Sequence, residues 1–294
     1  MSMRLVVTGA SGFLGGHICA RLDNESETMA LYHRNPQQKF GLNWRQCDLT
    51  NRRDLGQVRR FRPDVIIHTA AMSNLDQCEK FPKLAWDVNV TATKNLAFLA
   101  SDLDCRLIFT STDMVFDGAG QFYREHDPIN PISLYGQTKV TAEECIQTSC
   151  CNYVIARVAL IYGRPQLGGA SFLQWLEQRL GDRQTVELYK DQFRTPIWAD
   201  NLVECLLELA KNDFVGTLHL GGANRIDRYQ FGLQFCEIAG YDKSLLRSIS
   251  MKVHQMEAPR PADLSLSIEK AKSLIGIPLC TTQEGLSRMC NQQK

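Results

Sequence analysis

The stretch Thr8-Gly9-Ala10-Ser11-Gly12-Phe13-Leu14-Gly15 decides the fold, because it joins a short apolar run at 4–8 to a helix-forming segment. Gly9 permits a tight turn, Gly12 lets a phosphate approach the backbone, and Gly15 allows the helix to pack closely on the strand. The start of the helix offers free N–H groups and the positive end of a dipole to phosphates. We therefore expect a dinucleotide to contact Gly9, Ser11, Gly12, Phe13, Leu14 and Gly15.

The first half of the chain alternates apolar runs with amphipathic stretches, which is typical of strand–helix–strand units. Each run is continuously apolar, as expected for parallel strands that are covered on both faces. The pattern predicts an α/β fold, a Rossmann doubly wound parallel sheet. The expected strands are 4–8, 28–33, 64–69, 106–110 and 152–157, and the expected helices are 13–24, 51–60, 84–101 and 135–149.

The alternation changes after residue 165. A helix is expected at 171–181, and the segment 200–210 with a strand at 217–220 is expected to return to the first sheet. From about residue 223 the pattern indicates helices and loops. We predict a dinucleotide-binding domain over 1–165, to which 197–222 returns, and a smaller, mostly helical substrate-binding lobe over 166–196 and 223–294.

Composition limits the partners of the chain. Its 33 basic and 32 acidic residues give a net charge of +1, which provides no attraction for nucleic acid or an acidic membrane surface. No secretory signal and no apolar run of about 20 residues is present. The 11 cysteines are scattered, so we expect reduced, buried thiols, including Cys150 and Cys151, and a cytoplasmic location. No metal site is predicted, because no carboxylate–His cluster has ligand spacing.

The end of the second expected strand bears on the choice of cofactor. NAD sites usually carry an acidic residue there for the ribose hydroxyl, whereas this chain reads Leu31-Tyr32-His33-Arg34-Asn35. The Arg34 guanidinium can hold a 2′-phosphate through two charge-assisted bonds, and the Ser11 hydroxyl can add a third donor. NADP is predicted in preference to NAD, and a solvated surface arginine is the alternative.

Tyr135 and Lys139 form the candidate proton-transfer pair, because a spacing of four residues places both on one helix face. An ammonium about 4–5 Å from the phenol contributes on the order of 3–4 kcal/mol in a partly dry site. We therefore expect Lys139 to lower the Tyr135 pKa toward the range of a working acid. Thr112, at the end of the fourth expected strand, can hydrogen-bond a substrate carbonyl as it gains negative charge.

With these motifs the chain resembles the extended short-chain dehydrogenase/reductase superfamily, and within it the dTDP-4-dehydrorhamnose reductase group. The resemblance covers nearly the whole length. Its motifs are the glycine turn, Cys47-Asp48-Leu49-Thr50, His68-Thr69-Ala70-Ala71, Asp87-Val88-Asn89, Ser111-Thr112-Asp113-Met114-Val115-Phe116-Asp117-Gly118, Tyr135-Gly136-Gln137-Thr138-Lys139, Asp191-Gln192-Phe193-Arg194-Thr195-Pro196 and Arg260-Pro261-Ala262-Asp263-Leu264-Ser265-Leu266.

The resemblance implies a role for each matching position. Thr112 would orient the carbonyl, Tyr135 would donate the proton, and Lys139 would hold the nicotinamide ribose. Hydride would pass from NADPH to C4 of a nucleotide-linked 4-keto-6-deoxy sugar. The remaining implied contacts are Asp48, Leu49, Ala70 and Ala71 for the cofactor, and Asn89, Asp113, Met114, Trp175, Arg194 and Arg260 for the substrate.

Met114 departs from the pattern, because the group usually carries a tyrosine there; methionine is an adaptable filler. The difference leaves open the identity of the sugar and argues against a dehydratase, which needs a glutamate at this position. Two alternatives to the reductase remain: a nucleotide-sugar epimerase, and a nucleotide-binding regulatory subunit like the beta subunit of methionine adenosyltransferase. The expected partner is a small nucleotide-sugar, without nucleic acid or membrane, and a homodimer is left open.

Overall fold

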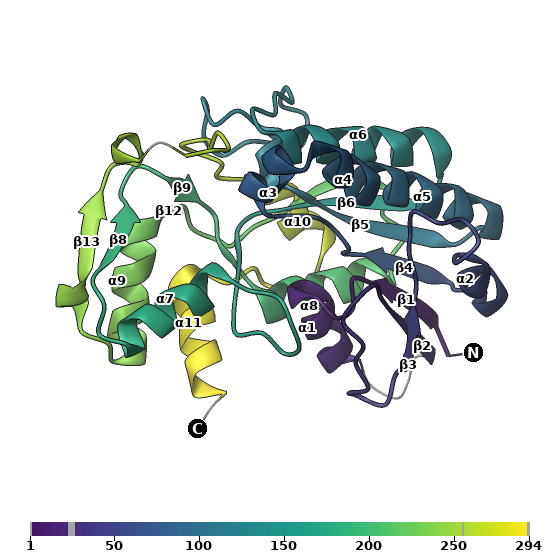
Figure 1. The fold of residues 1–294 in the computed structure, drawn as a ribbon, viewed down its shortest axis with the longest axis horizontal. Helices are drawn as coiled ribbons and strands as arrows, with labels where there is room; N and C mark the ends of the chain where they lie inside the picture. Colours follow the sequence, from purple (N-terminus) through teal and green to yellow (C-terminus); the bar gives the residue numbers. More distant parts are fainter. Residues whose placement is uncertain (1, 23–26, 255, 293–294) are drawn as a thin grey trace.

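The computed structural model, which describes residues 2–22, 27–254 and 256–292, has a seven-stranded parallel sheet at its centre (Figure 1). The strand order is β11-β6-β5-β4-β1-β2-β3, and every neighbouring pair is parallel. This order confirms the predicted Rossmann fold. The strands are β1 (Arg4–Thr8), β2 (Glu27–Tyr32), β3 (Asn43–Gln46), β4 (Val65–His68), β5 (Arg106–Thr112), β6 (Tyr153–Val158) and β11 (Gly216–Leu220).

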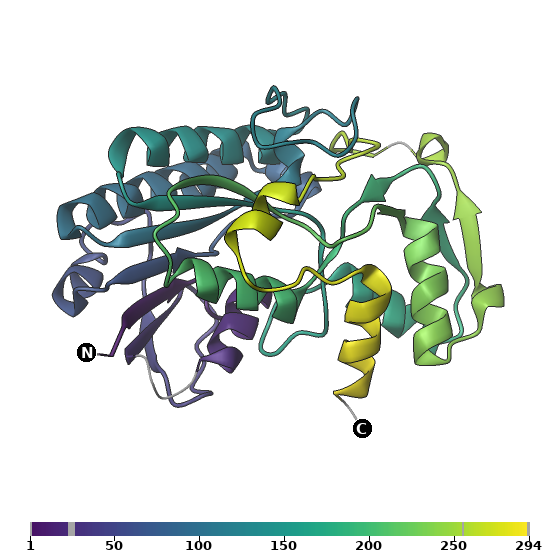
Figure 2. The ribbon, with the colours of Figure 1, turned by 180° about the vertical axis from the view of Figure 1, so that it is seen from behind.

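Helices cover both faces of the sheet (Figures 1 and 2). One face packs in a single apolar cluster with α1 (Phe13–Arg21), α8 (Ala199–Leu209) and α10 (Glu269–Leu274). The other face packs with α2 (Gly56–Phe61), α5 (Ala92–Leu103) and α6 (Leu134–Ser149). Burial on both faces explains why the central strands are continuously apolar.

A second group of elements packs beside the sheet around its own apolar cluster. In it β8 (Val186–Tyr189) pairs in parallel with β13 (Leu246–Ile249), and both strands contact α9 (Arg228–Ala239). The helices α7 (Phe172–Gly181) and α11 (Thr282–Asn291) complete the group. The strands β8 and β13 were not predicted. The division of the chain into two domains stays a prediction of the sequence.

Short strand pairs connect this group to the sheet. Two-residue strands β7 (Ile161–Tyr162) and β10 (Ile197–Trp198) are parallel, whereas β9 (Phe193–Arg194) and β12 (Ile226–Asp227) are antiparallel. Both pairs lie where the chain passes from the sheet to the second group.

Several element boundaries differ from the prediction. The helix expected at 84–101 is divided into α4 (Pro82–Trp86), a π-helical turn η1 (Asp87–Thr91) and α5. The helix expected from residue 51 begins only at Gly56, and α3 (Leu75–Lys80) was not predicted. The predicted end of the first helix at residue 24 lies outside the described residues, and α1 is described to Arg21. The remaining short elements are the 3-10 turns η2 (Asp113–Val115), η3 (Lys243–Leu245) and η4 (Met251–Val253).

All 11 cysteines are free thiols. All are buried except Cys145 and Cys290, which are half-buried, and Cys151, which is exposed. Burial raises the pKa of thiols such as Cys19, to about 12. The prediction that Cys151 is buried is therefore wrong, because the residue lies in the exposed turn after α6. Within 2–22, 27–254 and 256–292, no helix has the length and apolar character to cross a membrane.

Candidate active site

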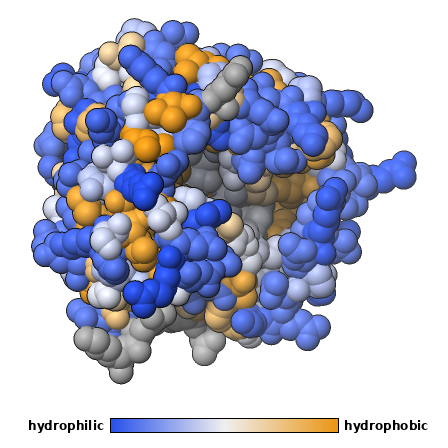
Figure 3. Space-filling view, turned by 60° about the vertical axis from the view of Figure 1, so that its left-hand side comes forward, coloured by the Kyte–Doolittle hydropathy of each residue, from blue (hydrophilic) through white to orange (hydrophobic). Residues whose placement is uncertain are grey.

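A cleft of about 920 Å³ opens between the carboxyl ends of the sheet strands and the second group of elements. The space-filling view shows the molecule hollowed near its centre (Figure 3). The glycine turn, the ends of β4 and β5, and the start of α6 form one wall. The opposite wall includes four polar residues: Gln192, Arg194, Arg228 and Arg260. Parallel sheets bind their ligands at this edge.

The glycine turn fits a dinucleotide phosphate. Gly12 caps α1 without any side-chain hydrogen bond, so the first N–H groups of the helix are directed to the cleft. Gly9 has a φ of +63°, and a Cβ on it would lie 2.8 Å from the Cα of Ala70. A Cβ on Gly15 would lie 2.7 Å from the Cα of Ala10. Neither Gly9 nor Gly15 can therefore carry a side chain without moving the backbone. The cleft is lined by Gly9, Ser11, Gly12, Phe13 and Leu14, and Gly15 is not part of its lining.

Only some of the residues expected at the adenine end of the cofactor line this cleft. Arg34 is exposed and lines the cleft, as do Ala70 and Ala71. Asp48 instead borders a neighbouring cavity of about 380 Å³, and its carboxylate accepts hydrogen bonds from Thr50, which hold its pKa below the ordinary value. Leu49 is buried in the core of the sheet. The two cavities share His33, which was not among the predicted residues.

The predicted catalytic residues Thr112, Tyr135 and Lys139 line the same cleft. Ser133 caps α6 by accepting a hydrogen bond from the Gly136 N–H, which fixes the start of the helix that carries the pair. Lys139 Nζ donates to the carbonyl of Thr110 at 2.7 Å and lies 3.9 Å from the centre of the Phe109 ring. Burial lowers the Lys139 pKa to about 7, against the opposing charge of Glu143.

The Tyr135 pKa contradicts the expected direction. Burial raises it above the ordinary value for a phenol, and the charge of Asp113 raises it further, although a hydrogen bond with Thr112 opposes both. Lys139 is not among the groups that shift the Tyr135 pKa, and its ammonium donates to the Thr110 carbonyl. Tyr135 therefore carries its proton at neutral pH, which suits an acid and not a base.

Asn89 is not at the cleft wall, where it was expected to contact substrate. It is buried in the π-helical turn η1, and its side chain bonds both backbone groups of Met72, at 2.8 and 3.1 Å. Its amide also donates to the Thr138 hydroxyl at 2.9 Å. Asn89 thus connects the loop after β4, which lines the cleft, to the helix that carries Tyr135 and Lys139. Single π-helical turns are frequent at functional sites.

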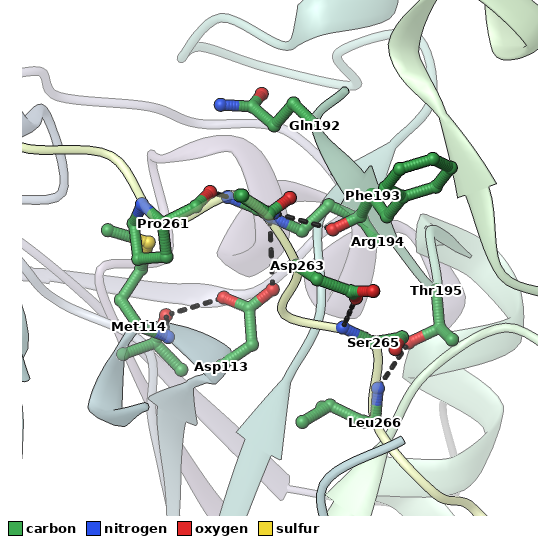
Figure 4. Close-up of polar contacts among 12 residues, drawn as sticks. Asp113, Met114, Gln192, Phe193, Arg194, Thr195, Pro261, Asp263, Ser265 and Leu266 are labelled. Carbon is green, nitrogen blue, oxygen red and sulfur yellow. Dashed lines mark hydrogen bonds and ion pairs between the residues drawn. The ribbon is translucent and has the colours of Figure 1, made fainter. Parts of the chain in front are cut away.

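The predicted substrate residues Asp113, Met114, Arg194 and Arg260 all line the cleft, whereas Trp175 does not. Arg194 Nε lies 3.7 Å from the Asp113 carboxylate, and its other nitrogens donate to backbone carbonyls, including that of Pro261 at 3.1 Å (Figure 4). Burial raises the Asp113 pKa, and Arg194 opposes this. Trp175 is 42% exposed and stacks on Phe172.

Two polar residues of the far wall, Gln192 and Arg228, were not assigned a role from the sequence. Arg228 Nε donates to Gln192 Oε1 at 2.9 Å, and its guanidinium lies 4.5 Å from the centre of the Phe172 ring. Gln192 belongs to a quoted motif, which could have indicated it. Arg228 belongs to no motif, and only the fold brings it to the cleft.

Among the described residues, no group of three or more His, Cys, Asp or Glu side chains has the arrangement of a metal site. The polar groups of the cleft are instead mainly donors: the N–H groups of the glycine turn, hydroxyls, side-chain amides, one ammonium and four guanidiniums, beside the Asp113 carboxylate. This donor-rich lining suits a polyanionic cofactor and substrate better than a cation.

A Rossmann sheet, a glycine turn and a Thr–Tyr–Lys site in one cleft define the class of extended short-chain dehydrogenases/reductases, which are NAD(P)-dependent oxidoreductases. A family model described as "RmlD substrate binding domain" matches residues 3–294. The chain belongs to this family.

Curated relatives agree over most of the chain. A probable low-salt glycan biosynthesis reductase of Haloferax volcanii is 31% identical over 98% of this chain and 97% of its own length. The dTDP-4-dehydrorhamnose reductase of Salmonella typhimurium is 30% identical over 83% of this chain and 85% of its own length.

Solved structures share the fold. The dTDP-4-dehydrorhamnose reductase of Bacillus anthracis, in complex with NADP, has a TM-score of 0.88 and 24% identity, covering 99% of this chain and 100% of that one. A hypothetical dTDP-4-dehydrorhamnose reductase of Sulfolobus tokodaii has a TM-score of 0.84 and 28% identity, covering 96% and 99%.

Proposed function

We propose that this chain is an NADPH-dependent reductase of a nucleotide-linked 4-keto-6-deoxy sugar, like the dTDP-4-dehydrorhamnose reductases, and that it acts in the cytoplasm. The observation that carries the proposal is the convergence of Thr112, Tyr135 and Lys139 with the glycine turn on one cleft. The names of the relatives support the substrate class.

The residues present fit NADPH. The N–H groups at the start of α1 would bind the pyrophosphate, and Arg34 would pair with the 2′-phosphate. Ala70 and Ala71 would lie along the cofactor, and Lys139 would bind the nicotinamide ribose. When bound, the reduced nicotinamide supplies the hydride. The bound NADP of the Bacillus anthracis structure supports the preference over NAD, whereas another structure of the same fold, at 22% identity, holds NAD.

The proton chemistry follows from the two perturbed groups. Tyr135 is protonated at neutral pH and hydrogen-bonded with Thr112, so both hydroxyls would meet the substrate carbonyl oxygen. As the carbonyl receives hydride, its oxygen becomes an alkoxide, which would take the Tyr135 proton. The resulting phenolate would lie one helical turn from Lys139, which donates to the Thr110 carbonyl and would act on the nicotinamide ribose.

The test is a panel of nucleotide-linked keto sugars assayed with NADPH and NADH, reading the loss of absorbance at the nicotinamide band. We expect oxidation of NADPH that depends on the sugar, with Tyr135→Phe slower by about 10²–10⁴-fold. NADPH should still bind the variant, because the phenol hydroxyl is not a phosphate contact. Turnover of Tyr135→Phe at the wild-type rate would disprove the role of the phenol.

The same assay separates the alternatives. An epimerase would retain its cofactor and show no net oxidation, while the sugar configuration changes. A regulatory subunit would bind NADPH, turn over none of the sugars and copurify with another enzyme. Met114, which is buried and lines the cleft, is the position that distinguishes this chain from the group pattern, so Met114→Tyr is informative on the sugar preference.

A further inference from the structure

A buried ion pair lies behind the active site, and the proposed reaction does not use it. Glu143 on α6 and Arg157 on β6 are each no more than 3% exposed, and neither is part of the cleft lining. Arg157 Nε lies 3.1 and 3.2 Å from the two carboxylate oxygens, and its Nη2 lies 2.8 Å from one of them. The Ser111 hydroxyl on β5 donates a hydrogen bond to the same carboxylate. The carboxylate therefore joins three elements, α6, β5 and β6.

The position of this pair indicates a role beyond stability. Two apolar side chains of similar volume are often as stable as a buried ion pair or more stable, because burying the charges costs free energy. Glu143 follows Lys139 by one helical turn, as Lys139 follows Tyr135. The three side chains thus share one face of α6, the helix that packs on β5 and β6 (Figure 1).

The end of β5 is held on α6 at two successive residues. Lys139 Nζ donates to the Thr110 carbonyl at 2.7 Å, and the Ser111 hydroxyl donates to Glu143. Thr112, the next residue, carries the hydroxyl that would meet the substrate carbonyl. Because successive side chains of a strand point to opposite faces, a side chain fixed at Ser111 also fixes the direction of the Thr112 hydroxyl.

The same carboxylate acts on the charge of Lys139. Lys139 faces Glu143 from its own helix and His68 from β4, and His68 is neutral because burial lowers its pKa to about 3. Of these two groups Glu143 carries the negative charge, which favours the ammonium against burial. Arg157 holds the carboxylate in this place through two of its nitrogens.

We propose that Glu143 is a positioning residue of the reduction: held by Arg157, its carboxylate fixes the end of β5 beside Lys139 and supplies the counter-charge of the ammonium. The proposal rests on the proposed function for the roles of Thr112 and Lys139. Glu143 acts through these two residues, because it is not part of the cleft lining. A misplacement of about 1 Å at the reacting groups can lower a rate by about 10²-fold, so a support behind the site affects the rate.

Two double variants of the full-length protein separate the hydrogen bond from the charge. Glu143→Leu with Arg157→Met removes both, whereas Glu143→Gln with Arg157→Met keeps an oxygen that can accept from Ser111. Neither leaves a buried charge of this pair without its partner, so both should fold. With a nucleotide-linked keto sugar, we expect the leucine double variant to lower kcat by about tenfold or more and to change KM little. The glutamine double variant should recover most of kcat.

Fluorescence titration with NADPH provides a readout that packing alone would not change. The wild type should lose affinity as the Lys139 ammonium loses its proton, near pH 7. Both double variants lack the carboxylate that favours the ammonium, so the Lys139 pKa should fall and the loss of affinity should move to lower pH. This titration needs no sugar, so its outcome is independent of whether the chain reduces a keto sugar.

Glu177→Leu with Arg164→Met is the matched control. Arg164 Nε lies 3.1 and 3.0 Å from the two Glu177 oxygens, in the same geometry, and neither residue lines the cleft. This variant should keep the kcat and the pH midpoint of the wild type. An unchanged midpoint in the two Glu143 double variants would overturn the proposal, as would an unchanged kcat in the leucine double variant. If the leucine double variant does not fold, the midpoint of the glutamine double variant decides.

Discussion

The charge of Lys139 depends strongly on the surroundings of its side chain. It is buried, bonded to the Thr110 carbonyl and held beside Glu143, whose carboxylate is also paired with Arg157 at 2.8 Å. His68, on the neighbouring strand, is neutral, because burial and Lys139 lower its pKa to about 3. Among these described neighbours Glu143 is the group that favours the charged ammonium.

The first prediction concerns the pH dependence of cofactor binding. The Lys139 pKa is lowered from 10.5 to about 7, so the ammonium loses its proton as the pH rises through 7. Because the charged form binds the cofactor better, NADPH affinity should weaken between about pH 6 and pH 8.5. Fluorescence titration of the wild type and Lys139→Met over this range measures the effect. The variant lacks this titration, and parallel curves for the two proteins would contradict the prediction.

Sequence reasoning found the residues that belong to motifs and missed those that the fold alone brings to the cleft. Thr112, Tyr135 and the glycine turn were assigned because strand ends and helix starts of a Rossmann sheet converge. Arg228 lies at the start of α9, far along the chain from Thr112, and no spacing rule connects the two. The acidity of Tyr135 was also mispredicted, because burial was not visible in the sequence and outweighs the expected ammonium.

At the scale of elements, the turn between β1 and α1 depends on backbone contact. Gly15→Ala would place a Cβ against the Gly9 carbonyl and 2.7 Å from the Ala10 Cα, and neither atom can move without displacing the turn. We expect a loss of about 1–3 kcal/mol in the free energy of unfolding and a loss of NADPH affinity. Urea unfolding and fluorescence titration measure the two effects.

Gly181→Ala is the control for this substitution. Gly181 ends α7, and a Cβ there meets nothing within 4 Å among the described residues. Alanine is the better helix former, so the variant should be neutral or slightly more stable. Equal destabilisation by both alanines would show that the close approach at Gly15 is not the cause.

The π-helical turn η1 connects two functional elements through one side chain. Asn89→Ala would leave the backbone groups of Met72 without their partner and remove the bond to Thr138. We expect a loss of about 1–3 kcal/mol, because buried polar groups lose their partners, with lower kcat as the α6 pair shifts. Asn130→Ala removes an exposed amide whose bond, to the Asp117 carboxylate, is open to water, and it should cost less. Unchanged stability and kcat in Asn89→Ala would show that Asn89 does not position the Tyr135–Lys139 pair of α6.

The elements that escaped prediction share a physical cause. The edge strand β3 is mostly exposed, so it needs no apolar run, and its sequence Asn-Trp-Arg-Gln gives no strand pattern. The strand β8 alternates buried and exposed residues over only four positions, and its partner β13 lies about 60 residues further along the chain. Short strands paired over such a separation give no local signal.

At the scale of the whole molecule, the Asp76–Arg260 ion pair joins the two sides of the cleft, as the Asp113–Arg194 pair also does. Asp76, at the start of α3, pairs with Arg260 at 2.7 Å and accepts a hydrogen bond from the Ala258 N–H. These bonds hold the Asp76 pKa below its ordinary value. The pair holds residues 258–260 against α3, the helix that borders the cleft.

Asp76→Ala should therefore release this segment. Because the pair is partly exposed, we expect a loss of at most about 1 kcal/mol in global stability. Amide hydrogen exchange over 256–262 should nevertheless be faster, since the Ala258 N–H loses its acceptor. Asp102→Ala breaks another ion pair, with Arg59, that lies away from the cleft and should leave this exchange unchanged. Equal exchange over 256–262 in the two variants would contradict the fastening role.

The single exposed thiol has a practical consequence. Maleimide dyes react with accessible thiols, and Cys151 lies in the turn between α6 and β6 while most of the other thiols are enclosed. A substoichiometric dye should therefore label Cys151 first, which peptide mass mapping would verify. Fluorescence anisotropy of the labelled protein would then give its rotational correlation time, which shows whether the protein is a monomer or a dimer.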